Sequence, residues 1–155
     1  MRKSINILII DPFPIALLGY ELCLKKYDKE FSFNLIVASS IKEALDILNE
    51  RTAIFFHTIL LDVDMKNTKI SDIQSGEDLA KSIKTKYPQT KIIALTERND
   101  SLRLYQIVNA INPNALITKA GLKKETFLNA VKAVLAQQKV YYSKSKDFTR
   151  EHYCS

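Results

Sequence analysis

Glycine, cysteine and long apolar runs are all scarce in this sequence, and each shortage excludes a class of protein. Only three glycines occur, Gly19, Gly76 and Gly121, so no glycine-rich loop is present to wrap the phosphates of a nucleotide. The two cysteines, Cys23 and Cys154, lie far apart and provide no disulfide framework. We therefore expect the protein to be located in the reducing cytoplasm. No apolar run approaches the roughly 18–20 residues of a membrane span, and the run near the N-terminus is too short for a signal peptide.

Histidine is also scarce, and the basic residues are scattered. His57 and His152 have no second ligand at metal-binding spacing, so a zinc site is not expected. The net charge of +6 comes from lysines spread along the chain, without a compact run of basic and aromatic residues. The charge therefore favours a solvated surface over a nucleic-acid patch, and we expect this domain to contact neither nucleic acid nor a membrane.

Short apolar runs alternate with segments of helical periodicity. The runs predict five strands, at residues 5–10, 33–38, 54–61, 91–95 and 115–118. Helices are expected at about residues 14–26, after Ser39 or Ser40, from Gly76, and at about residues 100–109 and 123–137. This alternation predicts an α/β fold of three layers, with a parallel sheet between helices. One domain is expected over residues 1–138, followed by a C-terminal tail or the start of a linker over residues 139–155.

Polar side chains stand at the carboxyl ends of four predicted strands. Asp11 and Asp62 end the first and third strands, and Thr96 and Lys119 end the fourth and fifth. Because parallel strands end at one edge of the sheet, where such folds bind ligands, we expect these side chains to converge. One strand-end aspartate is more often a turn residue, but four polar residues at equivalent positions are harder to dismiss.

The chemistry that suits these four side chains is phosphoryl transfer. A pair of carboxylates binds hard divalent cations such as Mg²⁺, and one carboxylate can attack phosphorus to form an acyl phosphate. A hydroxyl and an ammonium group could share the negative charge of the transferred group. The constellation therefore predicts an aspartate that accepts a phosphoryl group.

The motifs IIDPFP, LLDVDM, ALT and LITKAG, in this order and spacing, resemble those of the receiver domain of bacterial two-component response regulators. The resemblance covers about residues 4–140 and implies a flavodoxin-like (CheY-like) fold, with five parallel strands in the order 2-1-3-4-5 and five helices. It also implies that Asp62 is the phospho-acceptor and that Thr96 and Lys119 stabilise the phosphoryl group. Gly76 matches the glycine that begins the third helix of the family.

The resemblance implies a cofactor and partners as well. Mg²⁺ would be held by Asp11, Asp62 and the backbone carbonyl of Asp64. A sensor histidine kinase would donate the phosphoryl group, and the domain could form a homodimer through the face of its fourth helix, fifth strand and fifth helix. The protein would act as a conformational switch and not as an enzyme.

Two stretches, SGEDLAKSIK and KKETFLNAVKAVLAQQKVYYS, are similar to NarL/LuxR-type regulators of the Bacteroidetes kind, which control transcription. In that subgroup the last helix leads into a DNA-binding helix-turn-helix. No such motif occurs in these 155 residues, so we expect either a removed output domain or a stand-alone receiver.

The metal-binding part of the pattern is incomplete. Pro12 stands where the family has a second acidic residue, so Mg²⁺ binding is expected to be weaker, although Asp64 or Glu97 could partly compensate. Pro12 therefore keeps open an alternative, a pseudo-receiver that binds partners without phosphate. A flavin-binding relative would need an amide- or hydroxyl-rich loop after the first strand, which DPFP does not provide.

Other departures concern the switch and the loops. Leu116 stands where the family often has an aromatic ring that changes rotamer, so coupling through a flipping ring is not expected. The loop after the third strand is long and contains Lys66, which we expect to be solvated. Tyr105, Tyr141 and Tyr142 could mark an interface, but scattered aromatic residues more often serve packing.

Overall fold

The computed structural model describes residues 2–26, 29–50, 53–67 and 72–142. Within these residues, six parallel strands form one sheet in the order β2-β1-β3-β4-β5-β6. The strands are β1 (Lys3–Ile10), β2 (Phe31–Ala38), β3 (Thr58–Asp62), β4 (Lys91–Thr96), β5 (Ala115–Thr118) and β6 (Val140–Tyr142). The helices are α1 (Pro14–Lys26), α2 (Ile41–Glu50), α3 (Gly76–Lys86), α4 (Ser101–Ile111) and α5 (Lys124–Leu135).

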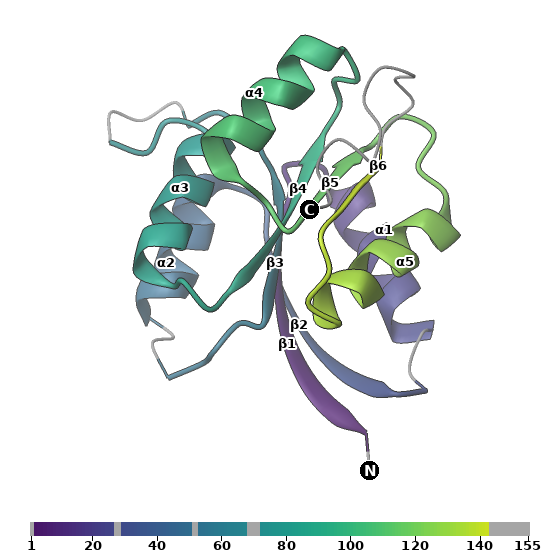
Figure 1. Cartoon of the computed structure of the whole chain (residues 1–155). Coiled ribbons are helices and arrows are strands. Elements are labelled where there is room, and N and C mark those ends of the chain that lie inside the picture. The colour runs from purple at the N-terminus through teal and green to yellow at the C-terminus, as the bar shows by residue number, and fades with distance from the viewer. Residues whose placement is uncertain (1, 27–28, 51–52, 68–71, 143–155) are drawn as a thin grey trace.

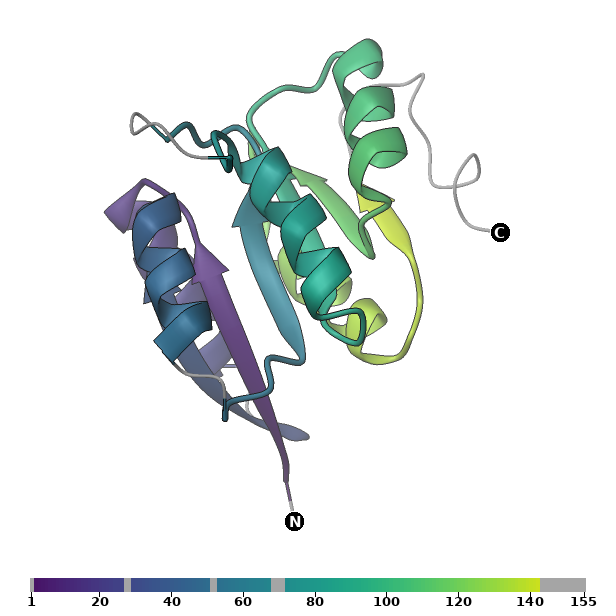
Figure 2. The same ribbon diagram turned by 90° about the vertical axis from the view of Figure 1, so that its left-hand side faces the viewer.

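Helices cover both faces of the sheet, as Figure 1 shows in edge-on view. The α1 and α5 helices pack on one face, and α2, α3 and α4 pack on the other (Figures 1 and 2). The central strand β1 supplies both cores, because Ile7 and Ile9 point to the first face while Leu8 and Ile10 point to the second. A strand covered by helices on both sides is apolar at successive positions, and this explains the uninterrupted apolar run at residues 7–10.

The predicted count of five strands is wrong, since β6 adds a sixth strand in the segment expected to be tail. Leu116 of β5 lies beside Tyr141 of β6 in parallel register. The Tyr141 side chain is buried, and its hydroxyl donates a hydrogen bond to the Pro113 carbonyl at 3.2 Å. Tyr141 therefore serves packing, Tyr105 lies at the surface, and the side chain of Tyr142 lies outside what the structure describes.

The predicted strand at residues 54–61 is also too long at its start. The β3 strand begins at Thr58, and the preceding His57 exchanges hydrogen bonds with Asn6: its amide donates to the Asn6 carbonyl at 2.9 Å, and its Nδ1 accepts from the Asn6 amide at 3.0 Å. Residues 143–155, which include His152 and Cys154, lie outside the described residues. Among the described helices, none has the length and apolar character needed to cross a membrane.

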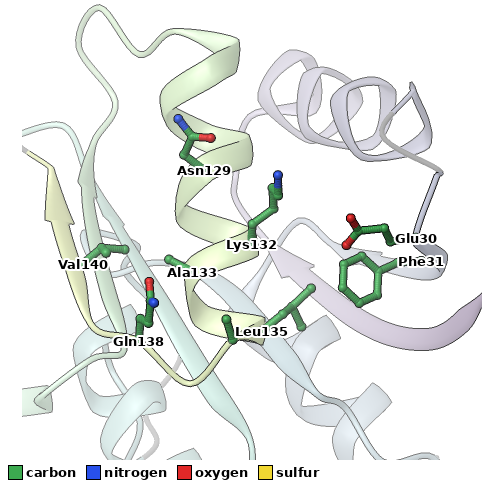
Figure 3. Close-up of a pocket in the computed structure, with 9 residues that line it drawn as sticks. Glu30, Phe31, Asn129, Lys132, Ala133, Leu135, Gln138 and Val140 are labelled. Atoms are coloured by element: carbon green, nitrogen blue, oxygen red, sulfur yellow. The ribbon is translucent and has the colours of Figure 1, made fainter.

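A shallow hollow of about 450 Å³ lies between α5, β6 and the start of β2 (Figure 3). Its walls include Phe31, Lys132, Leu135 and Val140. Phe31 and Val140 are the first residues of their strands, so this hollow lies at the amino ends of the sheet. It is therefore at the opposite edge from the polar residues that end the strands.

Candidate functional site

Three of the four predicted residues meet at the carboxyl edge of the sheet. Lys119 follows β5, and its Nζ lies 2.6 Å from Oδ2 of Asp11 and 2.8 Å from Oδ2 of Asp62. Both carboxylates are buried, Asp11 completely and Asp62 with 2% of its surface exposed. The ammonium group therefore joins two carboxylates from β1 and β3, as the strand-end positions predicted.

Each carboxylate is held in place by the backbone that follows it. The Phe13 amide donates to Oδ1 of Asp11 at 2.9 Å, and the Asp64 amide donates to Oδ1 of Asp62 at 2.8 Å. Aspartate commonly accepts from the amide two residues ahead, and this contact fixes the side chain at the start of a turn. In both residues the second oxygen is left to face Lys119.

Thr96 reaches the same edge but contacts a different residue. Its hydroxyl donates to Oδ2 of Asp64 at 2.7 Å, and the Glu97 amide donates to the same oxygen at 3.0 Å. Asp64 was predicted to act toward Mg²⁺, through its backbone carbonyl or in partial compensation for the missing acidic residue, so the contact of its side chain with Thr96 was missed. Nothing in the local sequence indicates it, because the contact depends on how the turns after β3 and β4 meet.

Arg103, in the first turn of α4, is a second residue that the sequence did not indicate. Its guanidinium lies 3.5 Å from Oδ1 of Asp64 and 3.0 Å from Oε1 of Glu77 at the start of α3. The Arg103 side chain is only 18% exposed. An arginine near a helix start is usually solvated, so only the tertiary arrangement shows that it ties α3 and α4 to the candidate site.

Burial sets the ionisation of the cluster. Desolvation raises the pKa of Asp62 above its usual value, and the opposing effects of Lys119 and of the Asp64 amide do not fully compensate. Burial by itself would lower the pKa of Lys119, but hydrogen bonds and charge interactions with Asp11 and Asp62 raise it overall. The lysine therefore remains a cation, while burial makes the charged form of Asp62 less favourable.

The pH dependence of stability is expected to report this raised pKa. Because folded Asp62 binds its proton more tightly than the unfolded chain, its contribution to stability is present below about pH 3.9 and is lost as pH rises through the folded-state pKa. Asparagine does not titrate. The free energy of unfolding of Asp62→Asn should therefore increase relative to the wild type between pH 4 and pH 7, measured by urea denaturation.

The matched control for this experiment is Asp46→Asn on α2. Asp46 forms a solvated pair with Lys42 at 2.8 Å, and such exposed pairs add little to stability. This variant should not gain stability at neutral pH. A difference between Asp62→Asn and the wild type that is constant or falls with rising pH would contradict the assignment.

The donor set fits a hydrated magnesium ion. Oδ2 of Asp11 and Oδ2 of Asp62 converge on the Lys119 ammonium group, which shows that both carboxylates can face one cation, and the Asp64 carbonyl belongs to the turn that follows Asp62. Mg²⁺ takes hard oxygen ligands and keeps several waters, so a few protein oxygens suffice. Pro12 offers no side-chain oxygen, and no group of three or more metal-ligating side chains occurs in the part of the chain that the structure describes.

Gly76 shapes the backbone beneath Asp62. It is the first residue of α3, and its amide donates to the Met65 carbonyl at 2.9 Å. A Cβ atom at this position would lie 2.1 Å from the Asp62 carbonyl oxygen and 2.8 Å from Cα of Val63. Only glycine permits this approach, so the start of α3 supports the turn that carries Asp62.

A cleft of about 730 Å³ opens over Asp62 and gives access to it from solvent. Phe13 and Ser39 line one part, and Lys66 and Arg98 line another. Lys66 is exposed, as expected for a solvated loop residue. The cleft also carries the carboxylates of Asp64, Glu77 and Glu97 and the guanidinium of Arg103, so charges of both signs surround the access to Asp62.

Comparisons with known proteins bear on the family and the fold. The family model for the response regulator receiver domain matches residues 7–132. No curated protein matches the sequence.

Among solved structures, the isolated REC domain of RcsB from Salmonella enterica serovar Typhimurium, studied with the phosphomimetic BeF3−, is 23% identical with a TM-score of 0.73. The alignment covers 90% of this chain and 94% of that one. A longer RcsB chain from Salmonella typhimurium gives 22% identity and a TM-score of 0.74, over 92% of this chain and 63% of that chain. This chain thus spans less than two thirds of the longer RcsB chain.

A CheY-like receiver domain protein from Methanospirillum hungatei JF-1 is 21% identical with a TM-score of 0.68, over 87% of this chain and 96% of that one. These likenesses confirm the flavodoxin-like fold predicted from the sequence. The sheet order β2-β1-β3-β4-β5 is as predicted, with β6 added at the edge.

Proposed function

We propose that this chain, which belongs to the response regulator receiver domain family, is a phosphorylation-dependent switch with Asp62 as its phospho-acceptor. The observation that carries the proposal is the environment of the Asp62 carboxylate. It is held by the Asp64 amide on one oxygen and by Lys119 on the other, at the base of an open cleft. An ammonium group in direct contact with the nucleophile is also in place to pair with the incoming phosphoryl group.

The proposed reaction transfers a phosphoryl group from a phosphohistidine of a sensor histidine kinase. A carboxylate oxygen of Asp62 attacks phosphorus, the P–N bond breaks, and histidine leaves as the acyl phosphate P–O bond forms. Lys119 moves part of its hydrogen bonding from Asp62 to the phosphoryl oxygens, and Thr96 donates its hydroxyl to the same group. Asp11, Asp62 and the Asp64 carbonyl would hold Mg²⁺, which would supply charge neutralisation when bound.

Intact-protein mass spectrometry tests this proposal directly. After incubation with acetyl phosphate and Mg²⁺, the wild type is expected to gain the mass of one phosphoryl group. Asp62→Asn should gain none, while Asp46→Asn on the solvated face of α2 should gain as much as the wild type. A wild type without any adduct, or an adduct that persists in Asp62→Asn, would overturn the assignment.

The output of the switch follows from the same proposal. We place the kinase as upstream partner in the cytoplasm and propose a homodimer through the face formed by α4, β5 and α5. On this chain β6 pairs along β5, so the edge of that face is formed by β6.

RcsB is described as dimers bound to DNA, and we propose by analogy a NarL/LuxR-type, Bacteroidetes-like regulator. DNA contact would then be made by an output domain and not by this one.

A further inference from the structure

The Thr96 hydroxyl has a single proton, and that proton already forms a hydrogen bond. It is donated to Oδ2 of Asp64, while the hydroxyl oxygen accepts from the Arg98 amide at 3.2 Å. A hydroxyl donates only one hydrogen bond at a time. If Thr96 donates to a phosphoryl group on Asp62, it must therefore release Asp64. The hydroxyl has two mutually exclusive partners, which makes the contact a two-state element.

Asp64 lies at the centre of the contacts that this change would alter. Its Oδ2 accepts from the Thr96 hydroxyl and from the Glu97 amide, and its Oδ1 lies 3.5 Å from the guanidinium of Arg103. The amides of Glu97 and Arg98 belong to the segment that joins β4 to α4. The loop before α4 is thus fixed to the same two side chains, Thr96 and Asp64, that phosphorylation would separate.

Arg103 extends this link into α4 itself. It projects from the first turn of the helix and is shared between Asp64 and Glu77. When the Thr96 hydroxyl no longer donates to Asp64, the carboxylate has lost one hydrogen-bond donor. The neighbouring guanidinium of Arg103 can replace it. Leu116 is completely buried and the Arg103 contacts do not include it, so the link through Arg103 does not use that position.

We infer that Asp64 and Arg103 transmit the phosphorylation state of Asp62 to α4. Arg103 is the positioning residue that couples the helix to the change of hydrogen-bond acceptor at Thr96. This inference rests on the proposed function, because it takes a phosphoryl group on Asp62 as the signal. It assigns the coupling to an ion pair on the surface of the cleft, in place of a ring that moves within the core.

Amide NMR spectra with beryllofluoride and Mg²⁺ test the inference. In the wild type, shifts are expected both around Asp62 and through α4 (Ser101–Ile111). In Arg103→Gln the shifts around Asp62 should persist, while those through α4 should fall by about twofold or more. Arg103→Lys keeps the cation and should restore part of the response.

Two matched variants separate transmission from a structural effect. Lys42→Gln removes an exposed cation on α2, where it pairs with Asp46 away from the cleft, and should respond like the wild type. Glu77→Gln removes the tie to α3 but leaves the Asp64–Arg103 pair, and should also retain the α4 shifts. A response lost equally in Arg103→Gln and Glu77→Gln would indicate a simple tether and overturn the inference.

The two proposals fail in different ways. If wild-type protein shows neither a phosphoryl adduct nor any shift near Asp62, the proposed function fails. If the site responds but α4 shifts equally in the wild type and Arg103→Gln, or does not shift in the wild type, only the transmission through Arg103 fails.

Discussion

Gly76→Ala is expected to destabilise the domain by about 3 kcal/mol or more, because the new methyl group would overlap backbone atoms. The contact of 2.1 Å with the Asp62 carbonyl oxygen involves main chain, which cannot rotate away as a flexible side chain can. The Val63 amide is bonded to the Leu95 carbonyl at 3.0 Å, so the turn is held from the other side. Either α3 or the turn after β3 must move, and phosphorylation of Asp62 should fall as well.

Gly19→Ala provides a control of opposite sign. Gly19 lies in the middle of α1, and a Cβ atom built there has no neighbour within 4 Å. Alanine is favoured over glycine in a helix interior by about 0.5–1 kcal/mol, so this variant should be more stable than the wild type. Urea denaturation of both variants measures the difference, and a Gly76→Ala protein as stable as Gly19→Ala would contradict the close approach of α3.

The site could be predicted from the sequence wherever strand geometry alone determines position. In a parallel sheet the residue after each strand falls at one edge, so Asp11, Asp62 and Lys119 were placed together correctly. The partner of Thr96 could not be predicted in this way. Its hydroxyl donates to a side chain on the turn after β3, and this contact depends on side-chain rotamers that strand periodicity does not determine.

The limits of the fold prediction have similar causes. The apolar run at residues 54–61 looked like one strand, yet Phe55 is half exposed and Phe56 is buried before β3 begins. An apolar run shows burial but not strand pairing, and the register with β1 begins at Thr58, one residue after the backbone hydrogen bond from His57 to Asn6. The β6 strand has three residues, too few for a periodic signal, and it forms because Tyr141 packs beside Leu116.

Lys119→Met is the other substitution for which we expect a large effect, since it removes the cation that compensates two buried carboxylates. Breaking a buried ion pair by removing one partner costs about 3–5 kcal/mol, because the remaining charge stays desolvated. Asp11 and Asp62 would then face each other with no ammonium group between them. Phosphoryl transfer to Asp62 should also fall, since the group that pairs with phosphoryl oxygens is lost.

The loss of stability in Lys119→Met should depend on pH and on magnesium. The pKa of Asp62, already raised by burial, should rise further without the cation, so the protonated pair is stable at low pH and the variant loses stability as pH rises. Mg²⁺ should bind the two carboxylates, which no longer have a compensating cation, more tightly than in the wild type and raise the Tm by mass action. Lys124→Met, at an exposed position in the first turn of α5, is the control and should show neither effect. If Lys119→Met lost less than about 1 kcal/mol at every pH, the lysine could not be the group that permits two carboxylates to be buried at this edge.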